Sequence, residues 1–135
     1  MTQENKELLL KDLCARLPYK VKASFYDKEE ECETWEQIDG IIIDGCVDIG
    51  LYSLPIERIK PYLFPLSSMT EEQKREYNYW KHEVPVCHYE YGEPVEEIEL
   101  YDSPESFEYL IKNHFDYHGL IERGLANDAT GLNIY

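Results

Sequence analysis

Two histidines four residues apart are the first place in this chain where residue type and spacing suggest chemistry. On one uninterrupted helix, His114 and His118 would present both imidazoles to a common metal ion. Gly119 follows them directly and favours the end of a helix, so we expect the helical geometry to fail within this stretch. The spacing therefore predicts structural or surface histidines rather than a metal site.

A second group combines His82, Cys87 and His88, which are close in sequence. Pro85 interrupts the stretch, and no fourth ligand accompanies the three. Cys87 beside His88 also has the composition of a thiol nucleophile and its base, but a reactive thiol needs an electropositive setting and this stretch is rich in acids. Neighbouring residues of a strand moreover point to opposite faces. We expect no metal, no cofactor and no catalytic residue.

Acidic side chains are too numerous to single out a catalytic pair. Glu29–Glu31 and the group Glu96, Glu97 and Glu99 form runs, whereas catalytic carboxylates sit singly in clefts with shifted pKa values. The sequence also lacks a glycine-rich phosphate loop, a Gly-x-Ser-x-Gly nucleophile motif and an Asp-x-Asp-x-Asp-Gly calcium loop. We therefore predict that the protein is not an enzyme.

Aromatic side chains suggest a different kind of function. Tyrosine supplies a large contact area for little lost conformational entropy, and 12 of the 135 residues are tyrosines. The candidate partner-binding residues are Trp80, Tyr89, Tyr91 and Tyr101. The alternative is that these residues cover the small hydrophobic core. If they are exposed together, we expect them to contact an unknown protein partner.

The charge of the chain is strongly negative. It has 28 acidic and 13 basic residues, which give a formal net charge of −15. Asp27–Glu57 holds ten acids and one base, and Glu83–Glu108 holds nine acids and no base. Direct binding to nucleic acid is disfavoured, because that affinity comes from Lys and Arg displacing counterions.

Two interpretations of this charge remain open. An acidic surface serves solubility in a crowded cell. The alternative is an acidic nucleic-acid mimic that inhibits a host DNA- or RNA-binding defence protein. The candidate residues of such a surface are Glu93, Glu96, Glu97, Glu99 and Asp102.

Cysteine usage and hydropathy predict the compartment. Cys14, Cys32, Cys46 and Cys87 include no closely spaced pair, which predicts reduced thiols rather than a zinc or disulfide framework. Cys14 and Cys46 fall in apolar settings and are expected to act as small hydrophobes. No apolar run approaches the ~20 residues that span a membrane, and the first residues lack the pattern of a secretory signal. We expect a cytoplasmic protein without a membrane partner, and leave its oligomeric state open.

Hydrophobic periodicity predicts the elements that position these residues. From Asn5 to Leu17, apolar residues recur every three or four positions, which predicts an amphipathic helix capped by Asn5 and ended by Pro18. The period changes to two over Tyr19–Phe25, which predicts a half-buried strand.

Further strands are expected over Thr34–Ile43 and Cys46–Tyr52. A two-residue turn at Asp44-Gly45 would join them, and Asp39-Gly40 is the expected position of a bulge. A single helical turn is expected within Pro55–Ile59, followed by an extended stretch.

Together these elements predict an α+β fold in a single domain, residues 1–135. Residues 1–69 would form an N-terminal helix and a small antiparallel SH3-like barrel or sheet, with a mostly helical half, residues 70–135, packed on it. Thr70-Glu-Glu-Gln73 matches a capping box, and Ser103-Pro104 is a helix start. Val84–Tyr101 is interpreted as either a strand pair or an extended arm.

Three stretches of the chain also resemble a known family. Ile59–Glu72 reads IKPYLFPLSSMTEE, His114–Ala126 reads HFDYHGLIERGLA, and Leu8–Tyr19 reads LLLKDLCARLPY. They are similar to small hypothetical proteins encoded by phages, prophages and mobile elements of gut anaerobic bacteria. The resemblance implies expression inside a bacterial host cell and carries over no activity, cofactor or catalytic residue. We therefore expect a non-enzymatic phage or mobile-element accessory protein that acts through protein–protein contacts.

Overall fold

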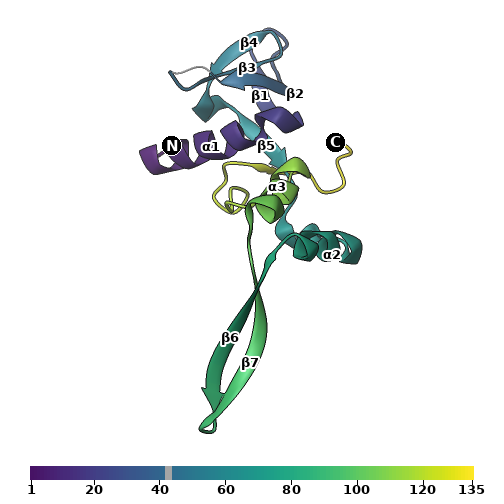
Figure 1. The fold of residues 1–135 in the computed structure, drawn as a ribbon. Helices are drawn as coiled ribbons and strands as arrows, with labels where there is room; N and C mark the ends of the chain where they lie inside the picture. Colours follow the sequence, from purple (N-terminus) through teal and green to yellow (C-terminus); the bar gives the residue numbers. More distant parts are fainter. Residues whose placement is uncertain (42–43) are drawn as a thin grey trace. The chain divides into compact units, whose positions relative to one another are not determined.

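The computed structural model describes residues 1–41 and 44–135 (Figure 1). The chain divides into two compact units. Unit 1 combines Met1–Ser68 with Ile111–Tyr135, and unit 2 is the intervening segment Met69–Leu110. The last 25 residues therefore fold with the first 68, and the second unit is inserted between them.

Unit 1 begins with helix α1, Gln3–Arg16. Its N-cap is Thr2 rather than the expected Asn5, because the Thr2 hydroxyl accepts the backbone N–H of Asn5 at 3.2 Å. Pro18 falls in the 3₁₀ turn that follows the helix, in agreement with its expected role as a terminator.

One side of α1 is buried, but it is not the purely apolar side that periodicity predicts. Leu9 and Leu13 are fully buried, as expected. Asp12 and Arg16 are equally buried, whereas Cys14 is exposed. The interpretation of Cys14 as a buried hydrophobe is wrong, since an ion pair occupies the interior in its place.

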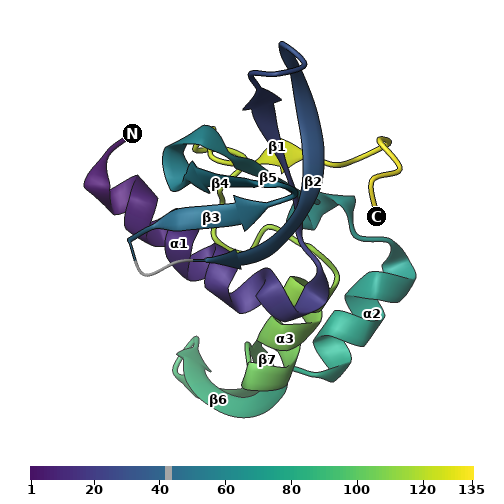
Figure 2. The same cartoon turned by 90° about the horizontal axis from the view of Figure 1, so that it is seen from above.

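A six-stranded sheet with the order β4-β3-β2-β1-β5-β8 forms the body of unit 1. Its strands are β1 (Lys22–Asp27), β2 (Cys32–Ile41), β3 (Cys46–Ile49), β4 (Tyr52–Pro55), β5 (Lys60–Leu63) and β8 (Asn127–Asp128). All neighbours are antiparallel except β5 and β8, which are parallel. Seen from above, α1 runs across the same sheet (Figure 2).

The connection of β2 to β3 confirms one expectation and corrects another. The register shifts between Ile38 and Gly40, where the sequence predicts a bulge. Ile41 pairs with Val47, whereas a two-residue turn at Asp44-Gly45 would place Ile41 opposite Asp48, so the observed register does not fit that turn. The last two residues of the expected strand, 42 and 43, lie outside the described part of the chain.

The C-terminal segment of unit 1 completes the sheet beside β5. The Phe64 amide donates to the carbonyl of His114, and the Asp116 amide donates to the carbonyl of Phe64, both at 2.8 Å. Farther along, the Ala129 amide donates to the carbonyl of Leu63 at 2.8 Å. The last residues of the chain therefore dock on the sheet through β8.

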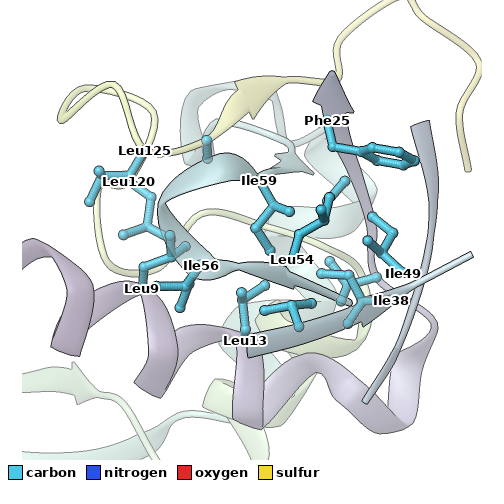
Figure 3. Close-up of a cluster of buried hydrophobic side chains, with 14 of the residues drawn as sticks. Leu9, Leu13, Phe25, Ile38, Ile49, Leu54, Ile56, Ile59, Leu120 and Leu125 are labelled. Carbon is cyan, nitrogen blue, oxygen red and sulfur yellow. The ribbon is translucent and has the colours of Figure 1, made fainter. Parts of the chain in front are cut away.

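A hydrophobic cluster lies in the interior of unit 1 (Figure 3). In this view Leu9 of α1 lies beside Ile56 at one side of the cluster, and Leu13 of α1 lies closer to Ile38. The fully or nearly buried members are Leu9, Leu13, Val21, Ala23, Phe25, Ile38, Val47, Ile49, Leu54, Ile56, Ile59, Leu63, Leu120, Leu125 and Ala126. Residues from both ends of the chain thus share one core, whose burial is the main stabilising contribution.

The α+β class is confirmed, but the SH3-like barrel is not. Within residues 1–41 and 44–135, no strand pairing joins β4 to β8, so the sheet is open. The predicted turn before β5 is present as the 3₁₀ turn Ile56–Arg58. None of the described helices combines the length and the apolar character that crossing a membrane requires.

Unit 2 contains helix α2 (Glu71–Tyr79), strands β6 (His82–Glu90) and β7 (Glu93–Tyr101), and the start of α3 (Pro104–Lys112). The predicted capping box is present: the Gln73 amide donates to the Thr70 hydroxyl at 3.1 Å, and the Thr70 amide donates to the Gln73 side chain at 2.9 Å. The Ser106 amide donates to the Ser103 hydroxyl at 3.0 Å, which agrees with the predicted start of α3. Residues 70–135 thus contain a long strand pair that the mostly helical expectation does not include.

Candidate functional site

The candidate functional site is the hairpin of β6 and β7. The two strands pair without interruption from His82 opposite Tyr101 to Glu90 opposite Glu93. Tyr91 and Gly92 form the connection, with φ angles of 52° and 81°. Two successive positive φ angles define a type I′ turn, whose twist matches that of the flanking strands. Of the two interpretations of Val84–Tyr101, the strand pair is the one that the structure shows, and its first strand begins two residues earlier, at His82.

Register divides the hairpin into two faces, because directly paired residues of antiparallel strands share a face. The apolar face carries Pro85, Cys87, Tyr89, Pro94, Ile98 and Leu100, together with Glu83 and Glu96. The acidic face carries Glu90, Glu93, Glu97 and Glu99, together with His82, Val84, Val86, His88, Val95 and Tyr101.

Neither face has a covering layer among the described residues, since no side chain of β6 or β7 is buried. On the apolar face, Ile98 is 68% exposed and Tyr89 is 77% exposed. An isolated two-stranded hairpin is marginally stable in water, and a contiguous exposed apolar face is typical of a surface that contacts a partner.

The four candidate aromatic residues are all exposed but do not form one cluster. Tyr89 and Tyr91 lie at the tip of the hairpin, while Trp80 and Tyr101 lie at its base. Seven positions of β7 separate the partner of Tyr89 from Tyr101, which corresponds to about 24 Å of strand. The expected single aromatic cluster is therefore divided into two groups, one at each end of the hairpin.

Tyr91 has an unusual position at the tip. Its side chain is fully exposed, and its backbone is left-handed, with φ 52°. Asn or Gly is the usual residue at this position of a type I′ turn. A tyrosine there buries nothing and carries a conformational cost, so the stability of the hairpin does not account for it.

The five candidate acidic residues are also divided. Glu93, Glu97 and Glu99 lie on the acidic face, and Glu96 lies on the apolar face. Asp102 has a structural role, because it accepts hydrogen bonds from the Tyr77 hydroxyl and, at 3.1 Å, from the Ser106 hydroxyl. Three of the five residues therefore share a surface.

A proline in each strand limits how a partner can bind. Pro85 pairs with Ile98, and Pro94 pairs with Tyr89. Proline has no amide hydrogen, so at these positions the strands lack the outward donor that an edge normally presents. Each edge is a poor template for a further strand, so the surfaces of the hairpin that stay open to a contact are its two faces and its tip.

The histidine pair of the sequence analysis does not form a joint site. His118 Nδ1 lies 2.8 Å from Asp12 Oδ2, and Arg16 contacts the same carboxylate through Nε at 2.5 Å. Burial alone would raise the pKa of Asp12, but hydrogen bonds from His118 and Arg16 lower it below its ordinary value. Arg16 Nη2 also donates to the carbonyl of Phe115 at 2.7 Å.

His114 lies in a different environment. Its ring stacks on Tyr135 with centroids 3.6 Å apart and planes inclined by 11°. Burial, followed by the charges of Arg16 and Lys22, lowers the pKa of His114 to about 4. His114 is therefore neutral at physiological pH and packs as an aromatic side chain.

Three stretches, Leu8–Tyr19, Ile59–Glu72 and His114–Ala126, contribute contacts to unit 1. Phe64 forms a bridge with Phe115, and their ring centroids lie 6.2 Å apart. Arg16 comes from the stretch Leu8–Tyr19 and contacts the same Phe115. These stretches hold the fold of unit 1 together, which is a structural role.

Two of the cysteines, Cys87 and Cys46, lie in settings that do not activate a thiol. Cys87 and His88 lie on opposite faces of the hairpin, as predicted for adjacent strand residues. Cys46 lines a surface hollow of about 320 Å³ together with Asp44 and Glu57. The hydrogen bond to Asp44 raises the pKa of the Cys46 thiol, which favours the unreactive protonated form.

Sequence reasoning missed one group on the acidic face. His88 lies close to Glu90 and Glu97, and the three offer ligand atoms that all lie within 4.8 Å of one another. The alternation of His88 and Glu90 is visible in the sequence, but the position of Glu97 depends on the hairpin register.

Comparisons of the chain with protein-family models, with curated proteins and with solved structures give no match. The function is therefore inferred from the geometry of the hairpin.

Proposed function

We propose that this protein is a phage or mobile-element accessory protein that acts in the cytoplasm of a bacterial host by binding another protein through the β6–β7 hairpin. The observation that carries the proposal is the exposed apolar face, on which Tyr89, Ile98 and Leu100 are all open to solvent. Covering this face would remove apolar surface from water, which is the main driving force of protein association.

Charge defines the chemistry of the partner. Six glutamates and no Lys or Arg lie between His82 and Tyr101. Two of them, Glu83 and Glu96, lie on the apolar face itself. A complementary surface is an apolar groove bordered by Lys or Arg, because charge complementarity directs encounter and excludes acidic partners.

The tip supports the same proposal. Tyr91 keeps a left-handed backbone although Asn would fit this turn better, and its side chain has no intramolecular role in burial. A contact with a partner would explain a tyrosine at this position, since tyrosine is enriched among the residues that contribute most of the binding energy of interfaces.

Site-specific photo-crosslinking tests the proposal. A photoreactive phenylalanine analogue would replace Tyr91, or Tyr79 on α2 as the matched control, since Tyr79 is also exposed, at 78%. We expect a crosslinked host protein from position 91 and not from position 79. Purified, that protein should bind the unlabelled chain and lose at least tenfold in affinity for the Ile98→Glu variant. Equal crosslinking at both positions, or unchanged binding of Ile98→Glu, would refute the proposal.

The acidic nucleic-acid mimic is the second candidate, and the shared face of Glu93, Glu97 and Glu99 is the observation in its favour. Alternate residues of a strand lie about 6.7 Å apart, whereas DNA carries one phosphate per ~3.4 Å of axis on each strand. The acidic face therefore has at most about half the linear charge density of one DNA strand, which is why we place this candidate second.

Displacement of DNA separates the two candidates. A mimic should release labelled DNA from basic proteins of the host lysate, and the triple variant Glu93→Gln, Glu97→Gln and Glu99→Gln should lose this effect. The Ile98→Glu variant should retain it. Loss of activity in Ile98→Glu alone would favour the apolar face and count against mimicry.

A further inference from the structure

We propose that His88, Glu90 and Glu97 form a binding site for a transition-metal dication of the Zn²⁺ type on the acidic face of the hairpin. His88 Nε2 lies 3.3 Å from Glu90 Oε1 and 4.0 Å from Glu97 Oε1. The ligand atoms of all three residues lie within 4.8 Å of one another. This site is independent of the proposed contact through the apolar face.

The distances suit a small tetrahedral ion. Zn²⁺ binds imidazole nitrogen and carboxylate oxygen at about 2.0–2.1 Å, so two ligand atoms of a tetrahedral site are about 3.3 Å apart. The distance from His88 Nε2 to Glu90 Oε1, 3.3 Å, has this value. The distance from His88 Nε2 to Glu97 Oε1, 4.0 Å, is longer than this value. Glu97 is an exposed side chain, and a small rotation would bring its oxygen into range.

The donor set defines the class of metal. Imidazole suits Zn²⁺, Cu²⁺, Ni²⁺ and Fe²⁺, whereas Mg²⁺ and Ca²⁺ prefer sites made entirely of oxygen. One imidazole and two carboxylates leave a position for water or a fourth ligand. Glu93 lies directly opposite Glu90 in the register and is a candidate for this fourth ligand.

The backbone places these three residues together without relying on a loop. His88 and Glu90 are two positions apart in β6 and so share a face. Glu97 lies two positions from Val95, the direct partner of His88, and is its diagonal neighbour. The site is therefore built on paired strands, which hold ligands more precisely than loops do.

A bound cation would reduce the repulsion between glutamates at this end of the hairpin. Glu90 and Glu93 are directly paired, and like charges in that arrangement destabilise a hairpin. The hairpin has no Lys or Arg to compensate them. A bound dication would remove this repulsion, so metal binding and hairpin order should reinforce each other.

Zinc titration of the full chain, followed by NMR of the histidine imidazoles, tests the proposal. We expect saturable binding of Zn²⁺ in which the His88 ring signals shift and those of His82, six residues away on the same strand, do not. The signal of an identified ring separates this site from binding to the four free thiols. Mg²⁺ at the same ionic strength should leave the His88 signals in place.

Matched glutamate variants complete the test. Glu97→Gln should weaken the Zn²⁺ affinity read from His88 at least tenfold, and Glu96→Gln, on the opposite face, should change it less than twofold. Amide exchange of β6 should slow on addition of Zn²⁺ in the native chain and in Glu96→Gln. An equal effect of the two substitutions, an equal response to Mg²⁺, or no shift of His88 would each overturn the proposal.

Discussion

Arg16 Nε lies 2.5 Å from Asp12 Oδ1 in the interior of unit 1, and neither side chain has exposed surface. They are four positions apart in the sequence, so successive turns of α1 bring them together. His118 completes the shell of the carboxylate at 2.8 Å. A fully buried ion pair of this kind is weak as a source of net stability but sensitive to the loss of one partner.

Removal of the Asp12 carboxylate should therefore destabilise the protein strongly. Asp12→Ala leaves the Arg16 guanidinium buried without its counter-charge, and we expect the free energy of unfolding to fall by about 3–5 kcal/mol. Denaturant titration measures this change. The double variant Asp12→Leu, Arg16→Met should recover most of the loss. Lys6→Ala, which breaks an exposed ion pair with Glu57, should cost less than about 1 kcal/mol.

His114 should make stability depend on pH. Burial, together with the charges of Arg16 and Lys22, lowers its pKa to about 4 in the folded protein, from 6.5 in the unfolded chain. Between these pH values the unfolded chain binds more protons, so stability falls as pH decreases from 6.5 toward 4. After allowance for solvent screening, the effect is on the order of 1–2 kcal/mol.

The His114→Asn variant isolates this contribution, because Asn tolerates the left-handed backbone of residue 114, with φ 63°. Denaturant titrations at several pH values should show a flatter dependence in the variant than in the native chain. If the free energy of unfolding depends on pH equally in the variant and in the native chain, other titratable groups determine the loss of stability at acid pH.

The capping box at Thr70 should control the start of α2. Thr70→Ala removes the hydroxyl that accepts the Gln73 amide at 3.1 Å, and the expected cost is about 1 kcal/mol. Amide hydrogen exchange in the first turn of α2 should accelerate about fivefold. Unchanged protection of these amides would show that the cap contributes nothing in solution.

The turn at the hairpin tip should respond in opposite directions to two substitutions. Tyr91→Asn fits the left-handed backbone better and should raise the protection of the β6 and β7 amides from exchange. Gly92→Ala should lower the protection of the same amides, by about 1 kcal/mol in the free energy of opening. The φ of residue 92, 81°, strains any side chain, although the space around it is open. Equal protection in both variants would contradict a type I′ turn.

Local signals in the sequence predict local structure well. The capping box at Thr70, the start of α3 at Ser103-Pro104 and the bulge near Gly40 are all present, because each depends on backbone groups a few residues apart. Alternation also indicates β1, in which Ala23 and Phe25 are buried, but the strand begins at Lys22 and the expected first residue, Tyr19, lies in the 3₁₀ turn Leu17–Tyr19.

Features that depend on distant pairing are not accessible from periodicity. Asp12 and Arg16 are not expected inside, because each is buried only through its pairing with the other and with residues about 100 positions later. The candidate residues of the hairpin are recognisable as aromatic or acidic, but their division into two faces depends on register. The same dependence hides the proximity of Glu97 to His88.

The parallel pairing of β5 with β8 links residues 62–63 to residues 127–128. A ribosome produces the whole of unit 2 between these two strands. During synthesis the outer border of β5 therefore stays uncovered while the β6–β7 hairpin is already complete. A nascent chain can thus present its proposed binding element before the sheet of unit 1 is complete. Truncation before residue 127 would remove β8 and leave β5 as an unpaired edge strand.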